Sequence, residues 1–144
     1  MHVGGDVRLA QVAVVIEREP MLCKIMRERF PDIRVICGDA RELGQLLATA
    51  GIGHVQAVVS GLPLLSLSKS VEHDILRQCF LVLPPDGFMV QFTYVPRPPV
   101  TRSVAADLNL KAARTGWVLE NFPPASVWVY RRELQLQLPV RQSA

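Results

Sequence analysis

The sequence has 144 residues, of which 49% are hydrophobic and 20% charged, and its 16 Lys and Arg against 13 Asp and Glu give a net charge of +3. This length suits one domain with a real core, and the composition excludes collagen-like, disulfide-rich and disordered chains. The charges are scattered and only mildly basic, so they do not by themselves indicate nucleic-acid binding. We expect residues 1–144 to form a single domain.

The first half of the sequence alternates β-branched runs with stretches of helical apolar spacing. Strands are predicted at residues 12–16, 33–37 and 55–59, and helices at 20–30 and 40–50. A proline suits the first turn of the first helix, and two glycines end the second. The first run, residues 12–16, is short and β-branched, which is typical of a strand buried on both faces.

The second half continues the alternation and then changes pattern. A helix is predicted over residues 70–83 with Ser70 as its N-cap, followed by a strand over 88–94 and a weaker helix over 102–113. Two last strands, at 117–122 and 127–131, are joined by a short Pro-rich loop, so we expect them to pair antiparallel.

This order of elements predicts the fold class. Strand, helix, strand, helix, strand, helix, strand indicates an α/β, Rossmann-like architecture with a mostly parallel sheet and helices on both faces. The last two strands add an antiparallel hairpin. Because ligands of such sheets bind beyond the carboxyl ends of the strands, the residues that follow each strand are the candidate site.

Two acidic residues follow consecutive strands. Glu17 ends the first, where a carboxylate can accept two hydrogen bonds from a ribose diol, or can simply be a solvated acid near a helix N-terminus. Asp39 follows the second, where it and Ala40 could read an adenine edge, or where Asp39 could be an ordinary N-cap. Both strands should run parallel, so we expect the two acids near each other at one sheet edge.

Polar and aromatic residues follow the next two strands. Ser60, Gly61, Leu62 and Pro63 come after the third strand, and Tyr94 after the fourth. Gly61 allows close backbone approach and Pro63 stiffens the loop, so its carbonyls could face a reacting amine. The alternative is an ordinary strand-to-helix loop.

The cysteines and the apolar segments exclude several other classes. Cys23, Cys37 and Cys79 form no metal-ligand spacing and lie among apolar residues, so each is expected to be a small buried side chain in a reducing compartment. No secretory signal or continuous membrane-spanning run is recognisable. We expect a cytoplasmic protein, with peripheral contact to the inner membrane still allowed.

Taken in order, several strings resemble one family. Val-Val-Ile-Glu-Arg-Glu-Pro, Gly-Asp-Ala, Val-Val-Ser-Gly-Leu-Pro, Gln-Phe-Thr-Tyr and Pro-Pro-Ala-Ser-Val-Trp look like the bacterial phospholipid N-methyltransferases over about residues 13–132. The resemblance implies a class I methyltransferase fold, S-adenosyl-L-methionine (SAM) as cofactor, methyl transfer to the amine of an ethanolamine lipid, and a membrane phospholipid surface as partner.

The resemblance also implies roles for residues. Glu17 with Arg18 would hold the SAM ribose, and Asp39 with Ala40 the adenine. Residues 60–63 would face methyl donor and acceptor, with Ser60 also touching the cofactor, and Tyr94 would lie beside them as a candidate base. His73 is a weaker candidate, since its polar mid-helix setting favours a surface histidine.

Two departures from the family pattern matter. The related RNA adenine dimethyltransferases carry an Asn/Asp-Pro-Pro-Tyr motif where residues 60–63 stand, and its absence disfavours base methylation and a nucleic-acid partner. Only sixteen residues precede Glu17, so the family's first strand and glycine-rich loop are missing and the domain is expected to be incomplete. That strand is central, so its loss should expose backbone, or force its neighbours to pair, and exposed edges invite homo-oligomers.

Three functions therefore remain open. The first is a lipid N-methyltransferase, the second a non-catalytic remnant or interaction module, and the third an enzyme like the rRNA adenine N-methyltransferases. Without the glycine-rich loop, we expect the chain alone to bind SAM weakly or not at all.

Overall fold

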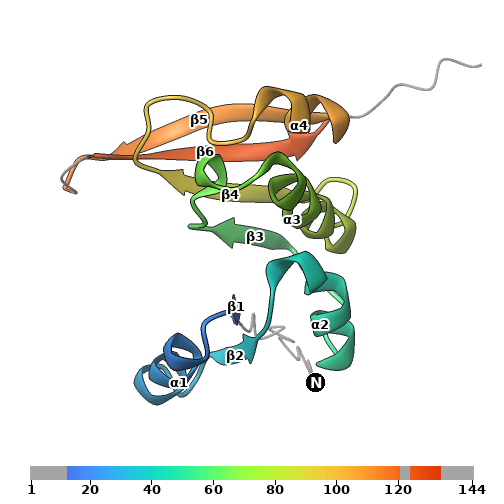
Figure 1. Cartoon of the computed structure of the whole chain (residues 1–144), viewed down its shortest axis with the longest axis vertical. Helices are drawn as coiled ribbons and strands as arrows, with labels where there is room; N and C mark the ends of the chain where they lie inside the picture. Colours follow the sequence, from blue (N-terminus) through green and yellow to red (C-terminus); the bar gives the residue numbers. More distant parts are fainter. Residues whose placement is uncertain (1–12, 121–123, 134–144) are drawn as a thin grey trace, which may run out of the picture.

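The computed structural model describes residues 13–120 and 124–133. Short strands alternate with helices through most of this range, and Figure 1 shows the strands stacked with the helices around them. In chain order the elements are β1 (Val14–Glu17), α1 (Pro20–Arg29), β2 (Arg34–Cys37), η1 (Ala40–Glu42), α2 (Leu43–Thr49), β3 (Ala57–Ser60), η2 (Leu64–Ser66), α3 (Lys69–Val82), β4 (Phe88–Thr93), α4 (Arg102–Asp107), β5 (Leu110–Val118) and β6 (Ala125–Arg132).

The strands form two separate sheets. β1 pairs with β2 in parallel, and the second sheet has the order β3-β4-β6-β5. In that sheet β3 and β4 are parallel, whereas β6 runs antiparallel to both of its neighbours. The predicted α/β class, with parallel pairs and a closing antiparallel hairpin, is confirmed. Among the described residues β1 and β3 do not pair with each other, so the direct pairing that the sequence analysis allowed is not seen.

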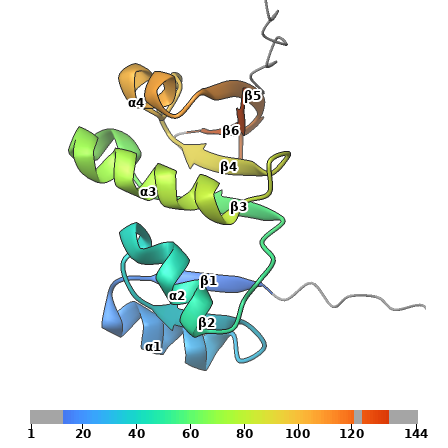
Figure 2. The same ribbon diagram turned by 90° about the vertical axis from the view of Figure 1, so that its right-hand side faces the viewer.

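The helices divide between the two faces. The chain passes from β1 to β2 in one sheet and then returns past β1 to β3 and β4 in the other. Because the direction of travel reverses after β2, right-handed crossovers place α1 on one face and α2 and α3 on the opposite face. Figure 2 shows α1 and α2 on opposite sides of the β1–β2 pair. Among the described residues, α1 is therefore the only helix on its side of the two sheets.

The core lies on the side of α3. Met89 and Gln91 of β4 point into it and are buried, whereas Phe92, the residue after Gln91, points to the other face and is exposed, as the two-residue period of a strand requires. The largest cluster of buried residues comprises Leu43, Leu47, Leu64, Ile75, Leu76, Cys79, Phe80, Leu83, Met89, Val100, Val104, Trp128 and Tyr130.

Two buried polar groups fix the segment that enters α4. Glu72, fully buried on α3, accepts hydrogen bonds from the backbone N–H of Thr101 at 2.6 Å and from its hydroxyl at 2.7 Å. The Tyr130 hydroxyl accepts one from the N–H of Val100 at 3.2 Å. Burial raises the pKa of Tyr130 to about 12, so this phenol stays neutral.

Three sequence predictions about local structure are wrong. The strand predicted over 117–122 begins at Leu110 and ends at Val118, so residues 119 and 120 lie outside it. The helix predicted over 102–113 ends at Asp107, because Asn109 has φ of 53° and Leu110 begins β5. The N-cap of α3 is Ser68, whose hydroxyl accepts the N–H of Val71, and not Ser70. The predicted strand residues 12, 121 and 122 lie outside the described residues.

Candidate functional site

Glu17 ends β1 at the carboxyl edge of the β1–β2 pair. The parallel register sets Glu17 opposite Cys37, so Asp39 follows at the same edge, as predicted. The Glu17 carboxylate accepts a hydrogen bond from the N–H of Glu19 at 2.8 Å, and its backbone carbonyl accepts the N–H of Gly38 at 2.9 Å. One carboxylate oxygen is thus held in place, and the half-buried side chain leaves the other for a ligand.

Asp39 is the N-cap of η1, which is the alternative considered from the sequence. Its carboxylate accepts the N–H of Arg41 at 2.9 Å and forms a salt bridge with the Arg41 guanidinium at 2.8 Å. These hydrogen bonds, together with the charge of Arg18, lower the pKa of Asp39 to about 2. Because Arg41 engages both oxygens, an adenine amino group would have to share Asp39 with Arg41 or displace it.

The turn between the acids is tightly packed. A Cβ on Gly38 would lie 2.7 Å from both methyl carbons of Leu46, so a larger residue directly before Asp39 would require that flexible side chain to shift. Beside Asp39 lies a shallow hollow of about 320 Å³ that Glu42 and Asp74 also line. Arg41 lines it as well, so the lining is polar and charged and is not the apolar slot that an adenine ring prefers.

The cysteines near this turn behave differently from one another. Cys23 is buried and donates to the carbonyl of Glu17 at 3.2 Å, whereas Cys37 is exposed, so the prediction that all three cysteines are buried is wrong for Cys37. The predicted burial of Cys79 is confirmed. No His, Cys, Asp and Glu side chains of the described ranges gather in a group that could hold a metal ion.

The loop after β3 is held by a residue that the sequence analysis missed. Fully buried Gln91 donates from Nε2 to the carbonyl of Leu62 at 2.9 Å, and Leu64 donates its N–H to the same oxygen at 2.8 Å. The Leu62 carbonyl is thus fully used. Gly61 accepts no hydrogen bond from any described residue and is exposed, so its carbonyl is the acceptor that this loop leaves free. Gln91 could have been found as the polar side chain on the apolar face of its strand.

Tyr94 leaves β4 at the same end of the sheet and is 64% exposed. Its flanking backbone is tied down by buried Ser126, whose hydroxyl donates to the carbonyls of Thr93 and Val95 and accepts the indole N–H of Trp128 at 3.1 Å. The Ala-Ser-Val-Trp string therefore has a structural role, because it fixes the backbone on both sides of Tyr94.

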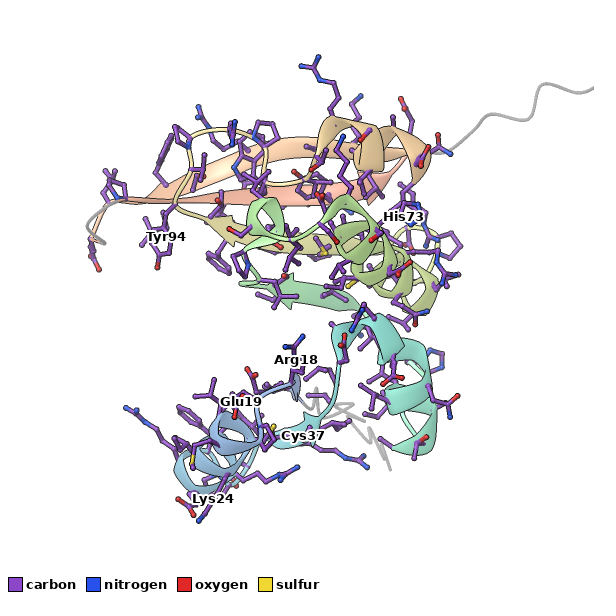
Figure 3. The ribbon with its side chains drawn as sticks, viewed as in Figure 1. Arg18, Glu19, Lys24, Cys37, His73 and Tyr94 are labelled. Atoms are coloured by element: carbon purple, nitrogen blue, oxygen red, sulfur yellow. The ribbon has the colours of Figure 1, made fainter. Side chains whose placement is uncertain are left out.

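The remaining predicted residues are only partly brought together. In Figure 3, Arg18 points from the end of β1 toward the four-stranded sheet, and Tyr94 lies beyond the end of β4. Figure 3 also places His73 far from Tyr94, and its partly exposed side chain lies 3.9 Å from the carboxylate of Asp107, so it takes no part in the candidate site. The acids and the loop of residues 60–63 belong to different sheets, and among the described residues β1 and β3 form no ladder that would join them.

Comparison with known proteins gives a relative in sequence and several in structure. No family model matches the chain. Over 86 residues it is 40% identical to an ornithine lipid N-methyltransferase of Singulisphaera acidiphila, a match that covers 58% of this chain and 45% of the relative. The chain thus spans less than half the length of this curated relative.

Two crystal structures show the same architecture. Magnesium protoporphyrin IX methyltransferase from Synechocystis PCC 6803, with bound SAM, superposes with a TM-score of 0.61 at 11% identity, over 85% of this chain and 60% of that one. The N-methyltransferase NodS from Bradyrhizobium japonicum WM9, bound to S-adenosyl-L-homocysteine, gives 0.57 at 14% identity, over 85% and 67%. The chain therefore has the Rossmann-like fold of the class I methyltransferases and is a homologue of a lipid N-methyltransferase.

Proposed function

We propose that the chain forms the adenosine-binding and acceptor-facing part of a SAM-dependent N-methyltransferase that acts on the amine of a membrane lipid headgroup. The observation that carries this proposal is the 40% identity to the ornithine lipid N-methyltransferase. The positions of the acids and of the loop after β3 agree with it, because both follow the carboxyl ends of parallel strands.

The donor half of the site rests on two carboxylates. Glu17 would accept hydrogen bonds from the ribose hydroxyls, and Asp39 with Ala40 would contact the adenine once Arg41 has moved or shares the carboxylate. Exposed Arg18 would lie beside the ribose. When bound, SAM supplies an electrophilic methyl group on a sulfonium, and the residues of the chain contribute position and exclusion of water.

The acceptor half rests on the loop after β3. The free carbonyl of Gly61 can accept an N–H of a neutral amine and so direct its lone pair toward the donor. Ser60 ends β3, and its hydroxyl accepts the N–H of Leu62 at 3.3 Å. Leu62 is 39% and Tyr94 64% exposed at this edge, and Pro63 stiffens the loop that carries Leu62. These apolar groups suit contact with a lipid surface, and the amine proton leaves to solvent.

The acceptor is proposed as a class, a primary amine on a lipid headgroup. The sequence resemblance favoured an ethanolamine phospholipid, and the relative is named for ornithine lipid. No helix within the described residues is long and apolar enough to cross a membrane. We propose that the protein works in the cytoplasm and reaches the inner membrane through the exposed side chains at the loop edge.

A binding experiment tests the donor half. We expect 5′-methylthioadenosine and SAM to bind the chain with similar weak affinities, because only the adenosine moiety is contacted. Glu17→Gln loses a charge-assisted hydrogen bond worth about 1.5–3 kcal/mol, so the affinities for both ligands should fall by roughly 10- to 100-fold. Glu28→Gln, on the exposed side of α1, is the matched control. Ligand-detected NMR titration measures these affinities, and equal binding by both variants would refute the ribose role.

A vesicle experiment tests the acceptor half. Co-flotation with vesicles that contain phosphatidylethanolamine or ornithine lipid should exceed that with phosphatidylcholine alone, and Leu62→Asp should reduce it. Leu81→Asp changes an equally apolar exposed residue on α3 and should have no effect. Indifference to Leu62→Asp would show that the loop edge does not face lipid.

A further inference from the structure

Two cysteines that are distant in the sequence meet at the turn that follows β1. Cys23 lies in the first half of α1, and its thiol donates to the carbonyl oxygen of Glu17 at 3.2 Å. Cys37 ends β2 opposite Glu17, and its thiol donates to the carbonyl oxygen of Arg18 at 3.9 Å. Because these carbonyls belong to consecutive residues, both sulfur atoms lie against the same short stretch of backbone. In Figure 3 the Cys37 side chain lies at the end of β2, beside the segment of Arg18 and Glu19 that leads into α1.

The surroundings of the two thiols differ, and the difference gives them different reactivity. Cys37 is exposed, so a small solute reaches its sulfur directly. Cys23 is fully buried, and it is protected from reagents in solvent. Burial raises the pKa of Cys23 to about 11, and the neighbouring thiol of Cys37 adds to this rise. This influence of one thiol on the other agrees with their placement at one turn.

The third cysteine takes no part in this arrangement. Cys79 is buried on α3, in the core cluster that packs on the four-stranded sheet. The described ranges also contain no group of three or more His, Cys, Asp and Glu side chains that could hold a metal ion around the two thiols. An exposed thiol beside a buried one is instead typical of a cysteine that an oxidant attacks and a second cysteine that resolves the product.

We propose that Cys23 and Cys37 form a peroxide-sensitive dithiol. The thiolate of Cys37 attacks one oxygen of hydrogen peroxide, the O–O bond breaks, and Cys37 becomes a sulfenic acid while the other oxygen leaves as hydroxide. The sulfur of Cys23 then attacks the sulfenic sulfur, the disulfide forms, and the hydroxyl group leaves with the Cys23 proton as water. In sum, two thiols and one peroxide give one disulfide and two molecules of water. A thiol reductant reverses the reaction, as a sensing disulfide in a reducing compartment requires.

The disulfide changes the turn that carries the Glu17 carboxylate. It joins α1 to the end of β2 and closes a ring over residues 23–37. Such a cross-link restricts the opened chain, so α1 and the β1–β2 pair open less often. It also removes the thiol donors of the carbonyls of Glu17 and Arg18. The inference does not depend on the proposed function, because it needs only the two thiols and their different exposure.

Peroxide treatment followed by peptide mapping tests the proposal. Trypsin places Cys23 and Cys37 in separate peptides, residues 19–24 and 35–41, so a bond between them is seen directly by mass spectrometry. After one equivalent of hydrogen peroxide and alkylation of the remaining thiols, we expect these two peptides to be linked, and dithiothreitol should separate them. Cys79→Ser is the matched control and should give the same linked pair.

Two variants separate the roles of the thiols. Cys23→Ala has no resolving thiol, so Cys37 should accumulate as a sulfenic acid that dimedone traps. Cys37→Ser has no exposed thiol, so Cys23 should stay reduced at the same dose of peroxide. In the oxidised wild type, amide hydrogen exchange over residues 24–36 should be at least tenfold slower than in the reduced chain.

Several results would overturn the inference. One is a wild-type Cys37 that advances to sulfinic acid without any linked pair of peptides. Another is a link between two chains, which the intact mass reveals, in place of a link within one chain. Oxidation of Cys23 in Cys37→Ser at the wild-type rate would show that Cys37 is not the first thiol to react. Unchanged exchange in the linked chain would show that the bond does not restrain α1 and β2.

Discussion

Replacing Gln91 with methionine should release the loop after β3 while barely changing global stability. The side chain donates to the carbonyls of Leu62 and Phe92 at 2.9 and 3.0 Å, and its Oε1 is buried without a partner among the described residues. Loss of two neutral hydrogen bonds costs about 1–3 kcal/mol, and removal of an unsatisfied buried oxygen regains about 1–3 kcal/mol. Methionine has a similar volume, so the free energy of unfolding should change by less than about 1 kcal/mol.

The local effect should be larger than the global one. Leu64 donates its N–H to the Leu62 carbonyl that Gln91 also holds, so release of that carbonyl favours local opening of the turn. A loss of about 1 kcal/mol of local stability corresponds to roughly fivefold faster amide exchange at Leu64. Gln78→Met is the matched control, because Gln78 bonds the N–H of Gly44 and lies away from the loop.

Two measurements decide the question. Urea unfolding followed by the fluorescence of buried Trp128 gives the global free energy, and exchange mass spectrometry gives the local rate. Gln91→Glu should be far worse at neutral pH, because an ionised carboxylate would face two carbonyl oxygens, and it should recover as acid protonates it. Unchanged exchange at Leu64 in Gln91→Met, or a global loss above about 3 kcal/mol, would refute this account of Gln91.

Three more predictions concern titratable and buried groups. Cys37 should react with a thiol reagent in the native protein, whereas Cys23, whose burial raises its pKa to about 11, should react only on unfolding; mass spectrometry of the labelled chain checks this. The hydrogen bonds from Arg41 lower the pKa of Asp39 to about 2, so its stabilising contribution is complete above the ordinary value of about 3.9 and is lost as pH falls toward 2. Urea midpoints between pH 5 and 2 should accordingly fall less steeply for Asp39→Asn than for the wild type, and parallel curves would contradict the assignment. Glu72→Ala should lower the free energy of unfolding by about 3 kcal/mol or more, because two hydrogen bonds from Thr101 to a carboxylate are lost, and a loss below about 1 kcal/mol in denaturant unfolding would contradict this.

Periodicity and β-branched composition predicted the alternation of strands and helices, because those signals arise from burial on sheet faces. They failed where one residue overrode the pattern. Asn109 adopts a left-handed conformation that ends α4 and lets Leu110 begin β5, and nothing in the apolar spacing announces this turn. The choice between Ser68 and Ser70 as N-cap likewise depends on backbone geometry. The two serines are separated by one residue and give the same sequence signal, so the sequence does not decide between them.

The candidate site was predicted in part. The rule that parallel strands end at one edge predicted the placement of Glu17 and Asp39. The hydrogen bond from the Arg41 guanidinium to Asp39 depends on the rotamer of Arg41, two residues further along the chain. Sequence spacing does not determine that rotamer. Gln91 was missed because its role depends on contact with Leu62, which lies 29 residues earlier in the chain.

The break between β1 and β3 also bears on the cooperativity of unfolding. The β1–β2 pair and α1 contain few buried residues, chiefly Cys23 and Val35, and are joined to the larger sheet by apolar side chains such as Val14 and Ile16 without a backbone ladder. Such a unit can open while the rest of the molecule stays folded, so we expect the described residues to form two cooperative units of unequal stability. The carboxylates of Glu17 and Asp39 lie in or directly beside the weaker unit, and any ligand that they hold would therefore raise the local stability of that unit first.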